Sequence, residues 1–162
     1  PNSSMTSRYL SSATNNNVDI EVKNTRSITL QNRPENAIKL ADFFSDYVKT
    51  YNIPDDVYND LRLVLEEAFI NITSYAYDKG DSQTITVDLN NTAGEISITF
   101  TDTGIAFNPL NHAVDNIETA DHCEGGMGIH IIRSLTDHQR YHRVGQSNVF
   151  TVTKHYTKHN NE

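Results

Sequence analysis

Two polar side chains, Glu67 and Asn71, stand four residues apart in the otherwise apolar segment LVLEEAFINI (residues 63–72). Residues at that spacing project from the same face of a helix. A carboxylate and an amide lodged among apolar neighbours need polar partners, because burying them without hydrogen bonds is costly. The pair is therefore predicted to border a wet cleft, although a solvated helix face is the commoner meaning of one such pair taken alone.

A second candidate segment, DTGIAFNP (residues 102–109), directly follows a predicted strand. Asp102 can accept a hydrogen bond from an exocyclic amine, and Gly104 permits the close approach of a flat ring. Taken alone, an acidic residue followed by glycine at the end of a strand is more often only a turn. The segment thus predicts either a turn or one wall of a pocket for a flat ring that carries an amine.

The third candidate is the glycine-rich run Gly125-Gly126-Met127-Gly128, which leads into an apolar helical pattern. Glycine-rich backbone at a helix N-terminus presents unpaired N–H groups and the positive end of the helix dipole. That combination suits a phosphate group. A helix entry that needs tight packing explains a lone G-G-x-G equally well.

Apolar periodicity predicts the elements that must position these three segments. Alternating apolar and polar residues indicate strands, and apolar spacings of three and four indicate helices. The two longest helices have such spacings at Ile38, Ala41, Phe44, Val48 and Tyr51, and at Leu61, Leu65, Ala68, Ile72 and Tyr75. In chain order the predicted elements are strands at 18–22 and 27–30, helices at about 33–51 and 56–77, strands at 84–89 and 95–100 joined by a hairpin loop at 90–94, a long loop at 103–124, a helix at 126–135, and strands near 139–144 and 148–154.

This order of elements predicts the fold class. Strands that pair with their neighbours in sequence favour a mixed, largely antiparallel sheet with the helices on one face, which is an α+β two-layer sandwich. The 162 residues amount to one domain. We expect a disordered polar tail at 1–17 and the folded domain at 18–157.

The composition limits the partners and the compartment. The chain carries 13 Lys and Arg against 21 Asp and Glu, a formal net charge of −8, and an acidic surface disfavours nucleic acids and anionic membranes. The sequence has no apolar run of the roughly 20 residues that a membrane helix needs, and no apolar stretch typical of a signal peptide near its start. A single cysteine, Cys123, suits a reducing compartment, so we expect a cytoplasmic protein.

Taken together and in this order, the three segments carry a specific resemblance. The E-x-x-x-N helix, the D-x-G-x-x-F-x-P segment and the G-G-x-G-I-x-x-I segment resemble the N, G1 and G2 boxes of the GHKL (histidine kinase-like) ATPase superfamily, whose nucleotide-binding domain is the Bergerat fold. The likeness covers about residues 26–155 and is greatest to the anti-sigma-factor serine kinases. The short lid of this chain, the form of its G1 box and its segment from Leu135 to Tyr141 are similar to those of that branch.

The resemblance implies a role for each candidate residue. Glu67 matches the general base, which would activate the hydroxyl group of a substrate Ser or Thr, and Asn71 matches the residue that helps to hold Mg²⁺ against the ATP phosphates. Asp102 matches the acceptor for the adenine amine, and Gly104 matches the residue that shapes the adenine pocket. The backbone that closes over the phosphates would be that of Gly125, Gly126, Met127 and Gly128.

The resemblance also implies partners, and two departures from the family pattern keep an alternative open. It implies ATP and Mg²⁺, an anti-anti-sigma protein as phosphoacceptor, a sigma factor as a sequestered partner, and a homodimer. The branch often has a cationic residue where this chain has Tyr75 and Arg where it has Glu124. Both changes remove positive charge near the expected γ-phosphate. An ATP-gated binding module without kinase activity is therefore the alternative, and a metabolic ATPase or a detached histidine-kinase domain is less favoured.

Overall fold

The computed structural model describes residues 24–75, 83–113 and 124–157. Its elements in chain order are strand β1 (Thr25–Gln31), the 3-10 helix η1 (Pro34–Asn36), helices α2 (Ala37–Thr50) and α3 (Asp55–Tyr75), strands β2 (Thr84–Thr92) and β3 (Glu95–Asp102), the 3-10 helix η2 (Pro109–Ala113), helix α4 (Glu124–Leu135), and strands β4 (His138–Val144) and β5 (Ser147–His155). The predicted tail at 1–17 and strand at 18–22 lie outside the described residues, and the domain limits of 18–157 stay a prediction. The other predicted helices and strands are confirmed where the structure describes them, with ends shifted by at most a few residues. The predicted loop at 103–124 contains η2 and lies in part outside the described residues.

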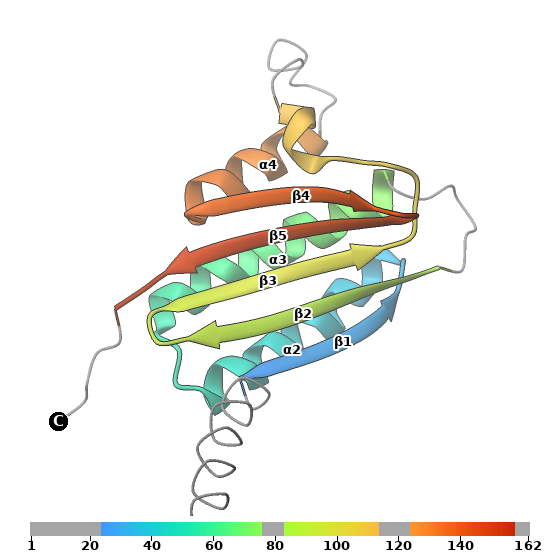
Figure 1. The fold of residues 1–162 in the computed structure, drawn as a ribbon. Coiled ribbons are helices and arrows are strands. Elements are labelled where there is room, and N and C mark those ends of the chain that lie inside the picture. The colour runs from blue at the N-terminus through green and yellow to red at the C-terminus, as the bar shows by residue number, and fades with distance from the viewer. Residues whose placement is uncertain (1–23, 76–82, 114–123, 158–162) are drawn as a thin grey trace, which may run out of the picture.

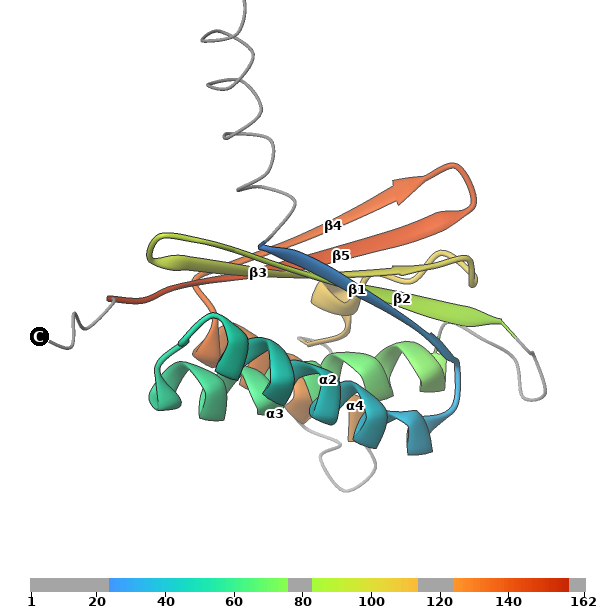
Figure 2. The ribbon, with the colours of Figure 1, turned by 90° about the horizontal axis from the view of Figure 1, so that it is seen from below.

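The five strands form one open sheet in the order β1-β2-β3-β5-β4, and every pairing between them is antiparallel. Figure 1 shows the sheet face-on, and Figure 2 shows that α2, α3 and α4 all lie on one side of it. This arrangement confirms the predicted α+β two-layer sandwich. None of the helices in the described ranges is long and apolar enough to cross a membrane.

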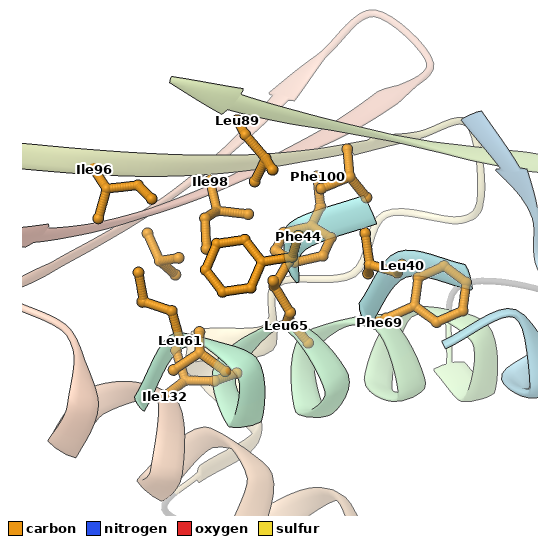
Figure 3. Close-up of a cluster of buried hydrophobic side chains, with 14 of the residues drawn as sticks. Leu40, Phe44, Leu61, Leu65, Phe69, Leu89, Ile96, Ile98, Phe100 and Ile132 are labelled. Atoms are coloured by element: carbon orange, nitrogen blue, oxygen red, sulfur yellow. The ribbon is translucent and has the colours of Figure 1, made fainter. Parts of the chain in front are cut away.

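The core fills the space between the two layers. Alternate residues of the strands and one face of each helix point into it, as Figure 3 shows for Phe44, Leu65, Phe69, Ile98 and Phe100. The apolar stripe predicted for α3 is buried from its start to Ile72, whereas its last member, Tyr75, is 37% exposed. The difference at Tyr75 matters below, because this ring contacts the loop after β3.

The predicted stripe of α2 was partly wrong. Ile38 is 70% exposed, and the buried residues of this helix are Leu40, Phe44, Tyr47 and Val48. Positions 40, 44, 47 and 48 also follow spacings of three and four, so the sequence fits two helix faces. Two residues correspond to about 200° around a helix, which places Ile38 opposite Leu40.

The hairpin between β2 and β3 is confirmed, but its predicted loop at 90–94 was too long. The strands pair as far as Thr92 and Glu95, so the loop is only Ala93 and Gly94, with φ +84° at Gly94. Asn91 is 4% exposed and its Nδ2 donates a hydrogen bond to the Tyr47 hydroxyl at 2.7 Å. A polar residue typical of turns therefore continues the strand here because the core offers it a partner.

Candidate functional site

Helix α3 carries Glu67 and Asn71 to its boundary with α4. Asn71 is 5% exposed, and Glu67 is half-buried. Gly128, in the second turn of α4, lies directly against both. A Cβ atom built on Gly128 would come within 2.7 Å of Glu67 Oε2 and 3.1 Å of Asn71 Nδ2. The structure thus brings together three of the predicted site residues from two segments that are far apart in sequence.

The environment of Glu67 alters its acidity. Partial burial raises the pKa of the Glu67 carboxyl above its usual range, and the neighbouring Glu66 charge raises it further. A carboxylate with a raised pKa binds a proton more readily, which is the property required of a general base.

Asp102 is the last residue of β3 and continues the inward-facing alternation of Ile98 and Phe100. It is 3% exposed. Its Oδ1 accepts hydrogen bonds from the backbone N–H of Gly104 and from Asn148 Nδ2, both at 2.9 Å. Burial raises the pKa of Asp102, while these two hydrogen bonds and the positive charge of Arg143 lower it. The predicted pair Asp102 and Gly104 is therefore one hydrogen-bonded unit.

The sequence interpretation missed Asn148. This residue of β5 is 3% exposed and stands directly opposite Asp102 in the β3–β5 pairing and opposite Arg143 in the β4–β5 pairing. The three residues form a row across neighbouring strands. The available signal was the alternation in β5, where Asn148 precedes Phe150 and Val152 at intervals of two. A polar residue on the core face of a strand end should have been a candidate.

An aromatic stack links the end of α3 to the loop after β3. The rings of Tyr75 and Phe107 are stacked, with centroids 5.5 Å apart and planes at 20°. Beside the stack is an open hollow of about 390 Å³, lined by Tyr75, Ala106, Phe107, Asn108 and Asn111. The stack therefore places the loop that follows Asp102 against the end of α3, the helix that carries Glu67.

The glycine-rich run begins α4 itself. Gly125, Gly126 and Met127 lie in its first turn, because the helix starts at Glu124, two residues before the predicted start. The first four N–H groups of a helix have no partner within it, so the backbone of this run is suited to bind an anion. Arg133 Nη2 of α4 donates a hydrogen bond to the Leu110 backbone oxygen at 2.9 Å, which anchors η2 to the same helix. Residues 114–123, which form part of the long loop predicted at 103–124, lie outside the described residues.

The comparisons with known proteins agree with the fold and with the family resemblance. The family model for the histidine kinase-like ATPase domain matches residues 30–154. A curated relative, the serine/threonine-protein kinase BtrW of Bordetella bronchiseptica, is 30% identical over 97 residues, which cover 59% of this chain and 68% of that protein. These matches confirm the resemblance to the GHKL superfamily and its serine kinase branch.

Two solved structures share the fold at low identity. The structure of the RsbU and RsbW domains of a Mycobacterium tuberculosis protein matches with a TM-score of 0.61 at 13% identity, over 83% of this chain and 33% of that one. The chain thus spans about a third of that structure. The SiaB–SiaC complex of Pseudomonas aeruginosa matches with a TM-score of 0.53 at 12% identity, over 78% of this chain and 88% of that one.

Proposed function

This chain belongs to the histidine kinase-like ATPase family, and from that premise we propose that it is a protein serine/threonine kinase that uses ATP and acts as an anti-sigma factor. The single observation that carries the proposal is the contact of Gly128 with Glu67 and Asn71. It puts a helix N-terminus suited to phosphate beside a carboxylate suited to act as a base.

The base of the nucleotide would bind at Asp102. The two hydrogen bonds that described residues donate to this carboxylate both go to Oδ1. Oδ2 is then the oxygen to accept a hydrogen bond from the 6-amino group of adenine, and Gly104 leaves room for the flat ring beside it.

The phosphates would bind at the first turn of α4. Backbone N–H groups of Gly125, Gly126 and Met127 would stabilise their charge, and Gly128 in the second turn brings this end of the helix against Asn71. The amide oxygen of Asn71 fits Mg²⁺, which prefers oxygen ligands and retains several waters, so that one side chain and the phosphate oxygens suffice. Bound there, Mg²⁺ would neutralise the negative charge of the phosphate oxygens.

Glu67 would carry the proton in the transfer step. The hydroxyl oxygen of a Ser or Thr attacks the γ-phosphorus, the bond to the β–γ bridging oxygen breaks, and ADP leaves. The hydroxyl proton passes to Glu67 Oε2. The raised pKa of Glu67 supports this role.

The partners belong to the same proposal. We propose that the phosphoacceptor is an anti-anti-sigma protein, that the chain also sequesters a sigma factor, and that it forms a homodimer in the cytoplasm. The family match, the BtrW relative and the fold shared with RsbW and SiaB support the first of these assignments, and the sigma factor, the homodimer and the cytoplasm are expected from the family resemblance alone.

A specific observation favours a second candidate, an ATP-gated binding module that transfers no phosphate. Tyr75, at a position where the kinase branch often carries a cation, places its ring on Phe107. Without a cation there, the developing charge at the γ-phosphate is less stabilised.

The experiment that separates the two candidates uses labelled ATP. Small proteins captured by this chain from its native cell are incubated with it, Mg²⁺ and γ-labelled ATP. The kinase proposal expects label on a Ser or Thr of a captured partner. Capture of a partner that depends on ATP but stays unlabelled supports the binding module. Calorimetry that detects no binding of ATP or ADP would contradict both.

A further inference from the structure

Asn148 is the most connected side chain of the described site. Its Nδ2 donates to Asp102 Oδ1 at 2.9 Å and to the Ile105 backbone oxygen at 2.8 Å. Its Oδ1 accepts from the Phe107 N–H at 3.1 Å, the Tyr141 hydroxyl at 2.5 Å and Arg143 Nη1 at 3.1 Å. Five hydrogen bonds therefore meet on one buried amide.

These contacts determine which way the amide points. Its two partners on the Nδ2 side are oxygens that accept, and its three partners on the Oδ1 side are N–H or O–H groups that donate. A flipped amide would oppose like groups in four of the five contacts, since only the Tyr141 hydroxyl can accept as well as donate, so only one orientation is consistent. Asn148 therefore presents a donor to Asp102.

The same amide fixes the chain that leaves Asp102. It bonds to the backbone of Ile105 and Phe107, while Arg143 Nη1 also donates to the Gly104 oxygen at 2.8 Å. A single residue of β5 thus contacts both the carboxylate and the loop beside it, and Arg143 of β4 holds the same loop at Gly104. Asp102 and Asn148 are paired neighbours in the sheet, so the strand register itself brings the two side chains together.

We propose that Asn148 is a positioning residue that sets the base selectivity of the site, by holding Asp102 as an acceptor for an amine at position 6 of a purine. The inference rests on the proposed function, because it assumes that a nucleotide base binds at Asp102. A base with hydrogen or oxygen at position 6 offers Asp102 no donor at that position. A carboxylate held in place and ionised binds a 6-amino purine more tightly than such bases, whereas a misplaced or protonated carboxyl group does not.

The test compares two ligands in each variant. ADP and the diphosphate of purine riboside, which lacks the 6-amino group, are titrated with Mg²⁺ by calorimetry. The ratio of their dissociation constants isolates the contact to the amine, because effects common to both ligands cancel. GDP serves as a third ligand, since its base carries oxygen at position 6.

Two substitutions change Asn148 in different ways. Asn148→Asp keeps the shape and the three accepted hydrogen bonds but replaces the donor to Asp102 with a second carboxylate, so a proton would be shared between them. Asn148→Ala removes all five bonds. Asn91→Ala is the matched control, because Asn91 is also a buried asparagine of the sheet but bonds to Tyr47.

The wild type is expected to prefer ADP by roughly 10-fold to 100-fold, the value of one hydrogen bond to a charged group. The preference should fall at least five-fold in Asn148→Asp and Asn148→Ala and stay unchanged in Asn91→Ala. If the wild type prefers ADP and a folded Asn148 variant keeps that full preference, the inference is overturned and the proposed function is unaffected. A wild type that binds none of the nucleotides would overturn the proposed function instead.

Discussion

A side chain on Gly128 of α4 would collide with the Glu67 carboxylate of α3. An added Cβ would lie 2.7 Å from Glu67 Oε2, which is closer than normal contact. The glycine thus allows α4 to approach α3 until the proposed phosphate-binding turn and the proposed base are neighbours. A substitution at Gly128 is therefore expected to change activity much more than stability.

Gly128→Ala should leave stability nearly unchanged and reduce activity. Alanine in a helix gains roughly 0.5–1 kcal/mol over glycine, which offsets the cost of moving the Glu67 side chain and of shifting the buried Asn71 amide, 3.1 Å from the added Cβ. The free energy of unfolding should stay within about 1 kcal/mol. Phosphoryl transfer should fall roughly 10²-fold, because the base is displaced. Urea denaturation and a transfer assay measure the two, with His130→Ala, an exposed position of the same helix, as control. Equal activity of Gly128→Ala and wild type would contradict the prediction, because the rate of transfer would then not depend on the position of Glu67.

Asp102→Asn should abolish nucleotide binding, with a loss of affinity of at least about 100-fold. The amide oxygen of the new side chain would accept the hydrogen bonds from Gly104 and Asn148 that Oδ1 now accepts. Its NH₂ group would then take the place of Oδ2 and face the adenine amine, donor against donor. Calorimetry with ADP checks this, and unaltered affinity would remove Asp102 from the pocket.

Asn71→Ala should weaken nucleotide binding only when Mg²⁺ is present. The substitution removes an oxygen ligand for the ion and leaves the Asp102 end of the site untouched. Titrations with ADP in Mg²⁺ and in EDTA measure the two affinities. A variant that loses affinity equally in both conditions would indicate that Asn71 supports the fold rather than the ion.

Glu67→Gln should be more stable than the wild type near neutral pH. Folding raises the pKa of Glu67 above its ordinary value of 4.5, so its charged form is disfavoured in the folded chain. The wild type therefore loses stability as the pH rises through the folded pKa and regains it as the pH falls toward 4.5. Melting temperatures measured between about pH 5 and pH 8 should converge at the acidic end. A variant that melts below the wild type at pH 8 would contradict this assignment.

The sequence predicts the site residues whose arrangement depends on neighbours close in the chain, and it misses those whose contacts lie far apart in the chain. Glu67 and Asn71 could be placed on one helix face because their spacing is local, and the alternation of β3 placed Asp102 at the end of a strand. Asn148 was missed because its contact with Asp102 depends on the register between β3 and β5, which are 46 residues apart at this pair. Ile38 was misplaced because two faces of α2 have helical spacing and only packing chooses between them.

The most direct test of the central claim is phosphoryl transfer by Glu67→Gln and Glu66→Gln compared with the wild type. The two positions differ by about 100° around α3, and Glu66 is exposed whereas Glu67 lies against Gly128. Transfer to the protein partner should fall roughly 10²–10⁴-fold in Glu67→Gln, with nucleotide affinity nearly unchanged, and stay close to wild type in Glu66→Gln. Loss of transfer in Glu66→Gln together with full activity of Glu67→Gln would contradict the account.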